Sequence, residues 1–419
     1  MKTKSVLIAA IATMTACSRA ADWPGYLGPN RDATSAEKGL LRSWPEAGPK
    51  VLWTVPLGPG YGGAAVSKGE VYVLDRVRDK QDVLRCLDLE TGLEQWSYAY
   101  DAPGRVSHPG SRSTPATNGN YIYTCGSFGH LYCFDRRTHK PLWNKNIWTD
   151  FDGGSPPRWA ISQNPLIYAD SVILASQTAK AGIVAYDKLS GQLKWASAAL
   201  PGSVGYVSPK IVNVVGENHL VMVTACSGDG TGGAVVGMDP ETGKLFWTYQ
   251  KWQCKIPIPN VTQAGDTRLF IAGGYRAGSA LLQIVKGGDS YTVTEIYKTE
   301  DFGTHCHPPV LHEGHLYAHY TTNERRDGMI CMDLAGKVKW KTERSPVFDK
   351  GGYILADGLI LSLDGRQGIL YLIEPDPAGF KPLASAKLLG ENECWGPLAL
   401  SDGKLLIRDQ EQMKCFAVR

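Results

Sequence analysis

The stretch that decides the fold is Asp88-Leu89-Glu90-Thr91-Gly92-Leu93-Glu94-Gln95-Trp96. Its spacing, Asp-x-x-Thr/Ser-Gly-x-x-x-Trp, returns at residues 187–195 and 239–247, and weaker or shorter copies occupy residues 135–143 and 333–340. An aspartate side chain accepts hydrogen bonds from the amides that follow it, and glycine adopts a positive φ at low cost. Each copy therefore predicts a tight turn that places its tryptophan on the strand leaving the turn.

Alternating apolar segments lie on both sides of each turn, as at residues 121–124 and 131–134. A proline also precedes each unit, where a first strand position needs no ladder donor. These prolines are spaced by 50, 44, 50 and 50 residues: Pro115, Pro165, Pro209, Pro259 and Pro309. The repeating unit is thus predicted to be a blade of four short antiparallel strands.

The number of blades follows from the tryptophan positions and their degenerate equivalents, which recur about every 48 residues. The sequence ends with three expected strands between Pro397 and Val418, and residues 51–56 can supply the missing fourth strand. Pairing the two ends would remove an open sheet edge. We therefore predict an all-β, eight-bladed propeller over residues 51–419, with seven blades as the alternative. The eight marker positions are Trp53, Trp96, Trp143, Trp195, Trp247, Tyr297, Trp340 and Ala386.

Composition excludes several classes of function. The chain has 419 residues, 47 of them glycine, and only 20 % are charged, which favours many turns and short strands. Its 44 basic and 41 acidic residues give a net charge of +3, too small for the basic footprint of a nucleic-acid-binding protein. No apolar run beyond the N-terminus is long enough for a membrane-spanning helix.

The first 21 residues have the order of a secretory signal: lysines, an apolar stretch, then small residues. Two processing sites compete. Cys17 could carry a lipid in a loose lipoprotein box, or cleavage could follow Ala20 or Ala21. We expect the protein to be exported to the periplasm, tethered to the outer membrane or secreted, with residues 22–50 forming an irregular segment ahead of the propeller.

Nine cysteines follow Cys17, and an odd number leaves at least one thiol unpaired within the chain. Disulfides are therefore not expected to be the main framework. Four of the cysteines recur at one place in the repeat, which predicts small buried apolar side chains: Cys86, Cys133, Cys331 and Cys415.

The repeat resembles the pyrroloquinoline-quinone-like β-propeller superfamily, which includes quinoprotein alcohol dehydrogenases and the outer-membrane β-barrel assembly lipoprotein. The C-terminal residues 402–407 and 415–419 look like the end of the assembly lipoprotein. Residues 23–32, with Trp44 and Trp53, resemble the N-terminal part of exported quinoprotein-like propellers, and this resemblance implies that residues 22–50 pack across the ring. A fold resemblance does not by itself assign a function.

The dehydrogenase members imply pyrroloquinoline quinone with calcium as a cofactor. The sequence departs from them because it has no Cys-Cys pair for a vicinal disulfide, no C-x-x-C-H haem site and little length for insertions between blades. No calcium ligand or catalytic aspartate can be carried over. We therefore predict no metal site and no cofactor, with the quinone kept as an alternative.

In this topology, the connections that leave the tryptophan strands and the hairpins between second and third strands open at one face. Ligand sites collect at such loops. Their basic and aromatic side chains suit an anionic, carbohydrate-like ligand, although the arginines could instead pair with nearby acidic groups. The candidate ligand-binding residues are Tyr61, Arg112, Arg158, Trp159, Lys255, Arg276, His305, His307, Lys350 and Trp395.

Two of these candidates belong to the sequence His305-Cys306-His307. Alternation on a strand would place both imidazoles on one face and the thiol on the other. His305 and His307 are therefore also candidate acid–base catalysts, with a structural or simple binding role as the alternative.

These observations favour an exported binding or scaffold protein whose loop-rich face engages an anionic, carbohydrate-like ligand or a protein partner. Two alternatives remain. One is an enzyme at the same funnel, either a quinone-dependent dehydrogenase or a carbohydrate-processing enzyme that uses His305 or His307. The other is a β-barrel assembly lipoprotein.

Overall fold

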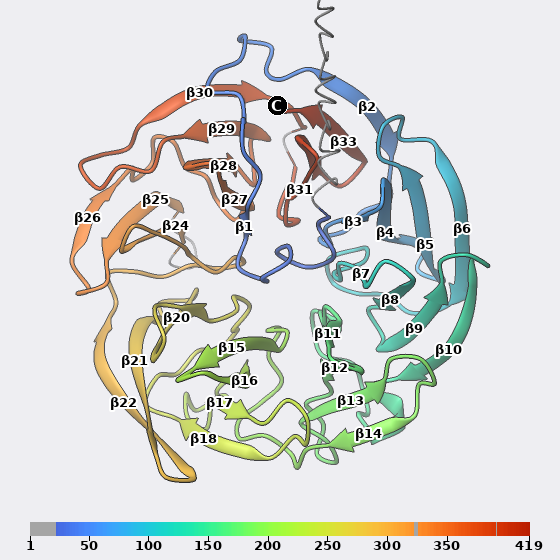
Figure 1. Cartoon of the computed structure of the whole chain (residues 1–419), viewed down its shortest axis with the longest axis vertical. Helices are drawn as coiled ribbons and strands as arrows, with labels where there is room; N and C mark the ends of the chain where they lie inside the picture. The colour runs from blue at the N-terminus through green and yellow to red at the C-terminus, as the bar shows by residue number, and fades with distance from the viewer. Residues whose placement is uncertain (1–21, 322–325, 391) are drawn as a thin grey trace, which may run out of the picture.

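Eight antiparallel sheets stand side by side in a closed ring (Figure 1). The computed structural model describes residues 22–321, 326–390 and 392–419. Within this part of the chain the only helical element is one 3-10 turn, η1 (Thr149–Phe151). The predicted eight-bladed propeller is confirmed and the seven-bladed alternative is wrong, whereas the expected signal peptide and Cys17 lie outside the described residues.

In each blade the chain runs outward, from a first strand beside the central channel to a fourth strand at the rim. The first four blades are β3 (Ala65–Ser67), β4 (Glu70–Val77), β5 (Gln81–Asp88) and β6 (Glu94–Asp101); β7 (Ala116–Thr117), β8 (Tyr121–Cys125), β9 (His130–Asp135) and β10 (Lys140–Asn146); β11 (Leu166–Tyr168), β12 (Ser171–Ala175), β13 (Ile183–Asp187) and β14 (Leu193–Ala196); and β15 (Lys210–Val214), β16 (Glu217–Val223), β17 (Val235–Met238) and β18 (Leu245–Tyr249).

The next three blades repeat this order, and a short strand, β1 (Thr34–Ser35), pairs in parallel with the innermost strand of blade 7. Blades 5 to 7 are β19 (Thr262–Gln263), β20 (Arg268–Gly273), β21 (Gly278–Gly287) and β22 (Ser290–Thr299); β23 (Val310–His312), β24 (His315–Thr321), β25 (Arg326–Asp333) and β26 (Val338–Lys341); and β27 (Tyr353–Ala356), β28 (Leu359–Leu363), β29 (Ile369–Ile373) and β30 (Pro382–Lys387).

Blade 8 closes the ring with strands from both ends of the chain. β31 (Ala399–Ser401), β32 (Lys404–Arg408) and β33 (Gln412–Ala417) are followed at the rim by β2 (Val51–Pro56). In this sheet Trp53 lies opposite Cys415. The predicted closure by pairing the two ends of the chain is confirmed.

The turn that defined the repeat has the predicted hydrogen bonds. The Asp88 carboxylate accepts bonds from the backbone amide and hydroxyl of Thr91 at 2.8 and 2.7 Å, and Gly92 adopts a φ of 71°. These bonds, above all the hydroxyl bond from Thr91, lower the pKa of Asp88. Aspartate and glycine are therefore required by the turn itself.

The tryptophan of one blade packs beneath the turn of the next blade. A Cβ atom added at Gly92 would lie 2.6 Å from the Trp53 ring, and one added at Gly191 would lie 2.6 Å from the Trp143 ring. The indole N–H of Trp53 donates to the Leu89 carbonyl at 2.9 Å. We call this contact the blade joint. It recurs between blades 3 and 4, and between blades 5 and 6 with a tyrosine in place of the tryptophan.

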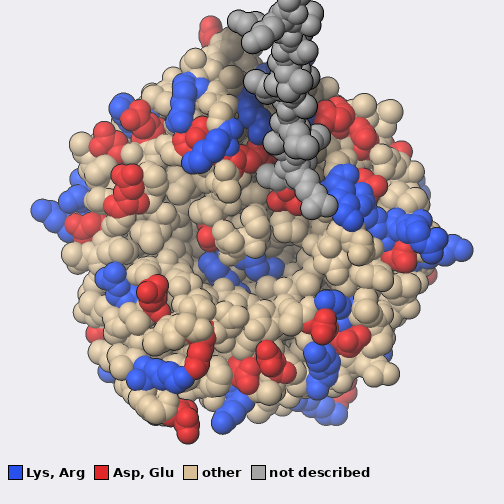
Figure 2. Space-filling view, in the orientation of Figure 1, with Lys and Arg blue, Asp and Glu red and all other residues tan. Residues whose placement is uncertain are grey.

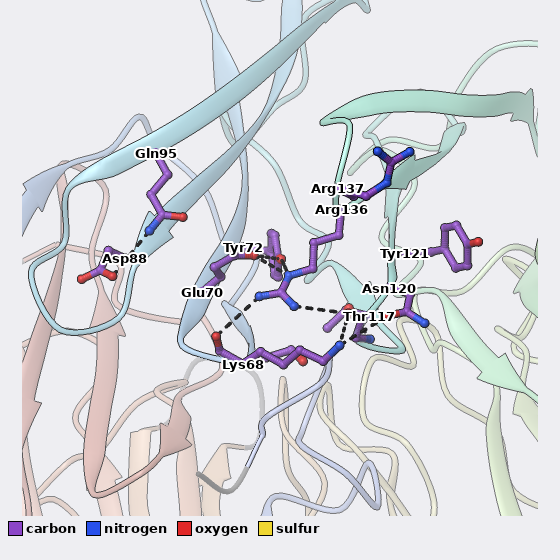
Figure 3. Close-up of polar contacts among 12 residues, drawn as sticks. Lys68, Glu70, Tyr72, Asp88, Gln95, Thr117, Asn120, Tyr121, Arg136 and Arg137 are labelled. Atoms are coloured by element: carbon purple, nitrogen blue, oxygen red, sulfur yellow. Dashed lines mark hydrogen bonds and ion pairs between the residues drawn. The ribbon is translucent and has the colours of Figure 1, made fainter. Parts of the chain in front are cut away.

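Between blades 1 and 2, His139 stands where the turn glycine would be and stacks on Trp96, with ring centroids 4.7 Å apart. A polar cluster supports the same junction (Figure 3). Arg136 donates to the carboxylate of Glu70 at 2.7 Å and to the hydroxyl of Tyr72 at 3.0 Å. The ammonium of Lys68 donates across to the Gly119 carbonyl at 2.9 Å. Stacking and ion pairing thus replace the glycine contact.

Blade 5 also lacks the repeat turn, and a long hairpin takes its place. The Trp247 indole bonds to Nδ1 of His219 within its own blade, at 2.9 Å. β21 and β22 have ten residues each and reach over blade 4, where Tyr291 packs 4.5 Å from His219 and 5.2 Å from Phe246. Glu217 bonds to Tyr291 and to Lys286 of the same hairpin. The hairpin therefore supplies the contact that the missing turn would have made.

The N-terminal segment crosses the ring (Figure 1) on the face that carries the turns between first and second strands. Asp22 accepts bonds from Ser67 and Lys68 in such a turn of blade 1. Asp357, in the corresponding turn of blade 7, accepts bonds from the amides of residues 39 and 40. Polar caps at turns of blades 1 and 7, which flank blade 8, therefore hold the segment in place.

The nine described cysteines are all free thiols, and eight of them are buried. The four recurrent cysteines lie directly opposite the joint residue of their blade, as Cys86 faces Trp96 and Cys133 faces Trp143. The expectation of small buried side chains is confirmed for these four residues.

We predict that Gly191→Ala destabilises the protein much more than Gly216→Ala. Both glycines have positive φ, 69° and 81°, so both substitutions strain the backbone by about 1 kcal/mol. Only Gly191 lies against an indole, since nothing is within 4 Å of a Cβ at Gly216. Overpacking should add about 1–3 kcal/mol at Gly191. Urea unfolding of the two variants measures the difference, and equal losses of unfolding free energy would contradict the blade joint.

Candidate functional site

All eight connections between blades meet at the face opposite the N-terminal segment. Each blade has four antiparallel strands, so its fourth strand ends at the face where the next blade begins. Together they surround a cavity of about 300 Å³. The predicted location of the loop-rich funnel agrees with this arrangement. The cavity is lined by Tyr26, Tyr61, His108, Arg112, Trp159, Ser162, Asn164, Tyr206, Ile256, Ile258, Tyr275, His305, Cys306, His307, Lys350, Trp395 and Pro397.

Charge is mixed on the surface, in keeping with the small net charge. In Figure 2 basic and acidic side chains are interspersed around the ring, and basic side chains also lie within the central hollow. The face seen in Figure 2 thus has no broad electrostatic footprint.

Seven of the ten predicted ligand-binding residues line the cavity: Tyr61, Arg112, Trp159, His305, His307, Lys350 and Trp395. The other three, Arg158, Lys255 and Arg276, are exposed outside it. Each of these three is next to a residue that does face the cavity, because neighbouring side chains on an extended or turning backbone point in different directions. Their loops were identified correctly, but their side chains do not line the cavity.

One side of the cavity combines aromatic rings with cations, and we call it the cationic wall (Tyr61, His108, Arg112, Lys350 and Trp395). The rings of Tyr61 and Trp395 lie 5.6 Å apart. The guanidinium of Arg112 lies over Tyr61 at 5.6 Å, and the ammonium of Lys350 lies over Trp395 at 4.3 Å. The Lys350 ammonium also pairs with the Asp349 carboxylate at 3.7 Å, whereas the Arg112 guanidinium has no ion pair with a carboxylate among the described residues. Cations on aromatic faces can also contact an anion at the same site.

Hydrogen bonds fix this wall in place. Arg112 donates to the carbonyls of His108 and Gly110 at 2.6 and 3.0 Å. Burial lowers its pKa to about 10, so the guanidinium stays charged at neutral pH. The Tyr61 hydroxyl bonds to Glu393, and burial together with this bond raises the pKa of Tyr61.

The opposite side, which we call the neutral wall (Tyr26, Trp159, Tyr206, Tyr275 and His305), carries no full charge. Trp159 and Tyr206 meet edge to face at 5.7 Å, and Tyr275 lies 4.6 Å from His305. Tyr26 comes from the N-terminal segment and bounds the cavity at its inner end. The two walls give the cavity a charged side and an uncharged side.

The expected strand geometry of His305-Cys306-His307 is wrong. The three residues lie in the loop between β22 and β23, and all three line the cavity. Pro308 and Pro309 follow directly, and they lack the N–H groups that a paired strand would need. The thiol is therefore not placed on the face opposite the two imidazoles.

Both histidines are held in their neutral form. Burial lowers the pKa of His305 to about 3, with Lys350 adding to the effect, and lowers that of His307 to about 4. Nε2 of His307 is 3.0 Å from the Trp395 carbonyl, which assigns the ring proton to that nitrogen. These imidazoles can exchange hydrogen bonds with a ligand but are poor proton acceptors near pH 7.

Tyr26, Tyr206 and Tyr275 were missed by the sequence prediction. Tyr206 lies in the connection between blades 3 and 4, and the signal that indicated Tyr61, an aromatic residue in such a connection, applies to it equally. Tyr275 is turned inward by its φ of 54°, and Tyr26 reaches the cavity only through the path of the N-terminal segment. Neither orientation leaves a pattern in the sequence.

A family model described as outer membrane protein assembly factor BamB matches residues 80–342, which is more than half of the chain. The chain belongs to the PQQ-like β-propeller superfamily. This membership confirms the resemblance inferred from the turn repeat, and the propeller that the superfamily implies is the fold described above.

Similar proteins come from both branches of this superfamily. The quinoprotein ethanol dehydrogenase of Pseudomonas aeruginosa is 28 % identical over 157 residues, which cover 36 % of this chain and 24 % of the dehydrogenase. The chain thus spans about a quarter of the length of the curated relatives it matches.

Two solved structures share the fold. The quinohemoprotein alcohol dehydrogenase from Comamonas testosteroni has a TM-score of 0.64 at 14 % identity, covering 95 % of this chain and 80 % of that one. BamB from Moraxella catarrhalis has a TM-score of 0.57 at 14 % identity, covering 88 % of this chain and 97 % of that one. At these identities the likeness concerns the fold alone.

The cavity does not fit a calcium-bound quinone. Calcium requires six to eight oxygen ligands, several of them carboxylates. The carboxylates at the cationic wall already have partners, since Glu393 bonds to Tyr61 and Asp349 accepts the Trp395 indole N–H at 3.2 Å. Across the described ranges, no three His, Cys, Asp or Glu residues are grouped so as to hold a metal ion.

Across residues 22–321, 326–390 and 392–419, no helix has the length and apolarity to cross a membrane.

We predict that stability falls as the pH drops from about 6.5 toward 4. His305, His307 and the buried His319 have pKa values well below the unfolded value of about 6.5. Between these values the histidines bind protons in the unfolded chain but not in the folded chain. Their contribution to the free energy of unfolding is therefore fully present above pH 6.5 and is lost below it. Each group contributes a slope of up to about 1.4 kcal/mol per pH unit. The charged or titratable groups near these rings are Lys350 for His305 and His307 for His319.

Urea unfolding between pH 4 and 8 measures this slope. His307→Gln should flatten it, whereas His315→Gln, at the first position of β24, should leave it unchanged. A slope shared by all three proteins would contradict the buried neutral state of His307.

Proposed function

We propose that this protein is exported and binds a small anionic, carbohydrate-like ligand in the central cavity. The observation that carries the proposal is the cationic wall, where Arg112 and Lys350 lie on the faces of Tyr61 and Trp395. Aromatic faces bind the apolar side of a sugar or planar ring, and the two cations favour a carboxylate. The cavity volume is near the lower end of the range of about 300–1,000 Å³ that suits small-molecule ligands.

An enzymatic alternative is less well supported. A general acid or base works best when its pKa is near the working pH, whereas the pKa values of His305 and His307 are about 3 and 4. The proton on Nε2 of His307 is also engaged with a backbone carbonyl. Quinone-dependent dehydrogenation would further need a metal cage that the cavity carboxylates do not supply. Binding alone agrees better with the chemistry of these residues.

We expect an acidic oligosaccharide such as trigalacturonate to quench the tryptophan fluorescence of the protein, because two tryptophans line the cavity. Lys350→Gln should weaken this binding about tenfold, since a charge-assisted contact is lost. Arg276→Gln removes a cation of the same face that lies outside the cavity, so it should leave the affinity unchanged. Binding should also weaken with added salt.

The controls for this titration are a neutral trisaccharide and pyrroloquinoline quinone, with and without calcium. Equal binding of the neutral trisaccharide, or equal losses in the Lys350 and Arg276 variants, would contradict anion recognition at the cationic wall. Stoichiometric, calcium-dependent binding of the quinone would instead favour the dehydrogenase alternative.

A second candidate is an outer-membrane scaffold for a protein partner, and the family match to an assembly factor supports it. This candidate predicts a lipid on Cys17, because a protein without a membrane span needs an anchor at the membrane. The intact mass of the protein purified from membranes measures this directly. A mass that corresponds to cleavage after Ala20 or Ala21 would contradict the tethered scaffold.

A further inference from the structure

The neutral wall contains polar groups that the fold itself does not use. Tyr26 is 8 % exposed, and its hydroxyl has no hydrogen-bond partner within residues 22–321, 326–390 and 392–419. The Tyr275 hydroxyl is likewise unpartnered in these ranges. The Nδ1 atom of the neighbouring His305 is buried and has no hydrogen-bond partner in the described residues. A buried polar atom without a partner costs about 1–3 kcal/mol, so groups of this kind are usually satisfied by a ligand or water.

Geometry brings these hydroxyls together with His305. Tyr275 lies 4.6 Å from the His305 ring, and all three residues line the same cavity. They come from different parts of the chain: the N-terminal segment, the β20–β21 hairpin and the connection before β23. Burial keeps His305 neutral, so the group presents hydroxyls and an imidazole without any charge.

We infer that the ligand is a hydroxylated monocarboxylate, a sugar acid, whose carboxylate faces Arg112 and Lys350 and whose hydroxyls face Tyr26, Tyr275 and His305. The inference rests on the proposed function and specifies its ligand. Two cations on one wall match one carboxylate. The uncharged donors and acceptors on the other wall match hydroxyl groups and would leave a second carboxylate within the cavity unpaired, so an acidic oligosaccharide places only one of its carboxylates there.

The arrangement makes the N-terminal segment part of the site. Tyr26 is held by its neighbours: the Arg31 guanidinium lies 5.6 Å from its ring and donates to the carbonyls of Pro165 and Asn164 at 2.9 and 3.1 Å. Asn164 itself lines the cavity. Tyr26 is therefore a specificity-determining residue that the propeller blades alone could not provide.

Three probes of similar size separate the two walls. Glucuronate carries the carboxylate and the hydroxyls, glucose lacks the carboxylate, and cyclohexanecarboxylate lacks the hydroxyls. Isothermal titration calorimetry of the full chain should give the tightest binding for glucuronate, with at least about a tenfold loss for each of the other two probes.

The double variant Tyr26→Phe/Tyr275→Phe should weaken glucuronate binding about 5- to 20-fold and leave cyclohexanecarboxylate binding unchanged, because it removes only two hydroxyls. Tyr132→Phe, on β9 and away from the cavity, is the matched control and should change neither. Thermal unfolding of each variant verifies that it folds.

The outcomes distinguish this inference from the proposed function. If glucuronate and cyclohexanecarboxylate bind equally well, or the double variant weakens both to the same extent, the hydroxyl contacts are overturned and anion binding stands. If neither carboxylate binds and trigalacturonate also fails to bind, the proposed function is overturned together with the inference.

Discussion

The contact between a tryptophan and the turn of the next blade is the constraint on which the structure depends. Each blade touches only its two neighbours, so the angle between blades is set at these junctions and determines how many blades complete the ring. An indole beneath a glycine with positive φ leaves no room for another side chain. Where the glycine or the tryptophan is missing, other contacts fill the junction: His139 on Trp96, and the long β21–β22 hairpin against blade 4.

The same constraint separates stability from function within each blade. The joints lie near the face that carries the turns between third and fourth strands, whereas the connections between blades lie at the opposite face. Those connections are free to carry residues chosen for the cavity. Arg112 is tied to carbonyls of its own connection, whereas Tyr61 and Trp395 bond to Glu393 and Asp349 in neighbouring connections. The cationic wall is therefore held by bonds within and between these loops. A rigid ring with variable loops is a common arrangement for binding sites.

The fold could be predicted almost completely from the sequence, because the turn requires aspartate and glycine and the joint requires tryptophan. Even the degenerate positions Tyr297 and Ala386 fall on the expected outermost strands. The site was predicted less well. Loop membership follows from the repeat, but side-chain direction depends on single φ values and on the path of a nonrepeating segment, as Tyr275 and Tyr26 show. The alternation of His305, Cys306 and His307 predicted a strand. The two prolines that follow lack N–H groups, and this stretch of backbone is not paired in a sheet.

The mixed origin of blade 8 has a consequence for how the chain is made. Its rim strand is β2, near the N-terminus, and its other three strands are the last in the chain. A chain that emerges N-terminus first therefore carries β2 without its sheet partner until β33 is available. Seven blades can form before β33 is available, but the ring then remains an open arc with sheet faces exposed at its two ends. Closure of the ring therefore waits for the last strand, β33. A chain that ends before β33 would lose the pairing that closes the ring, and not only one strand of one blade.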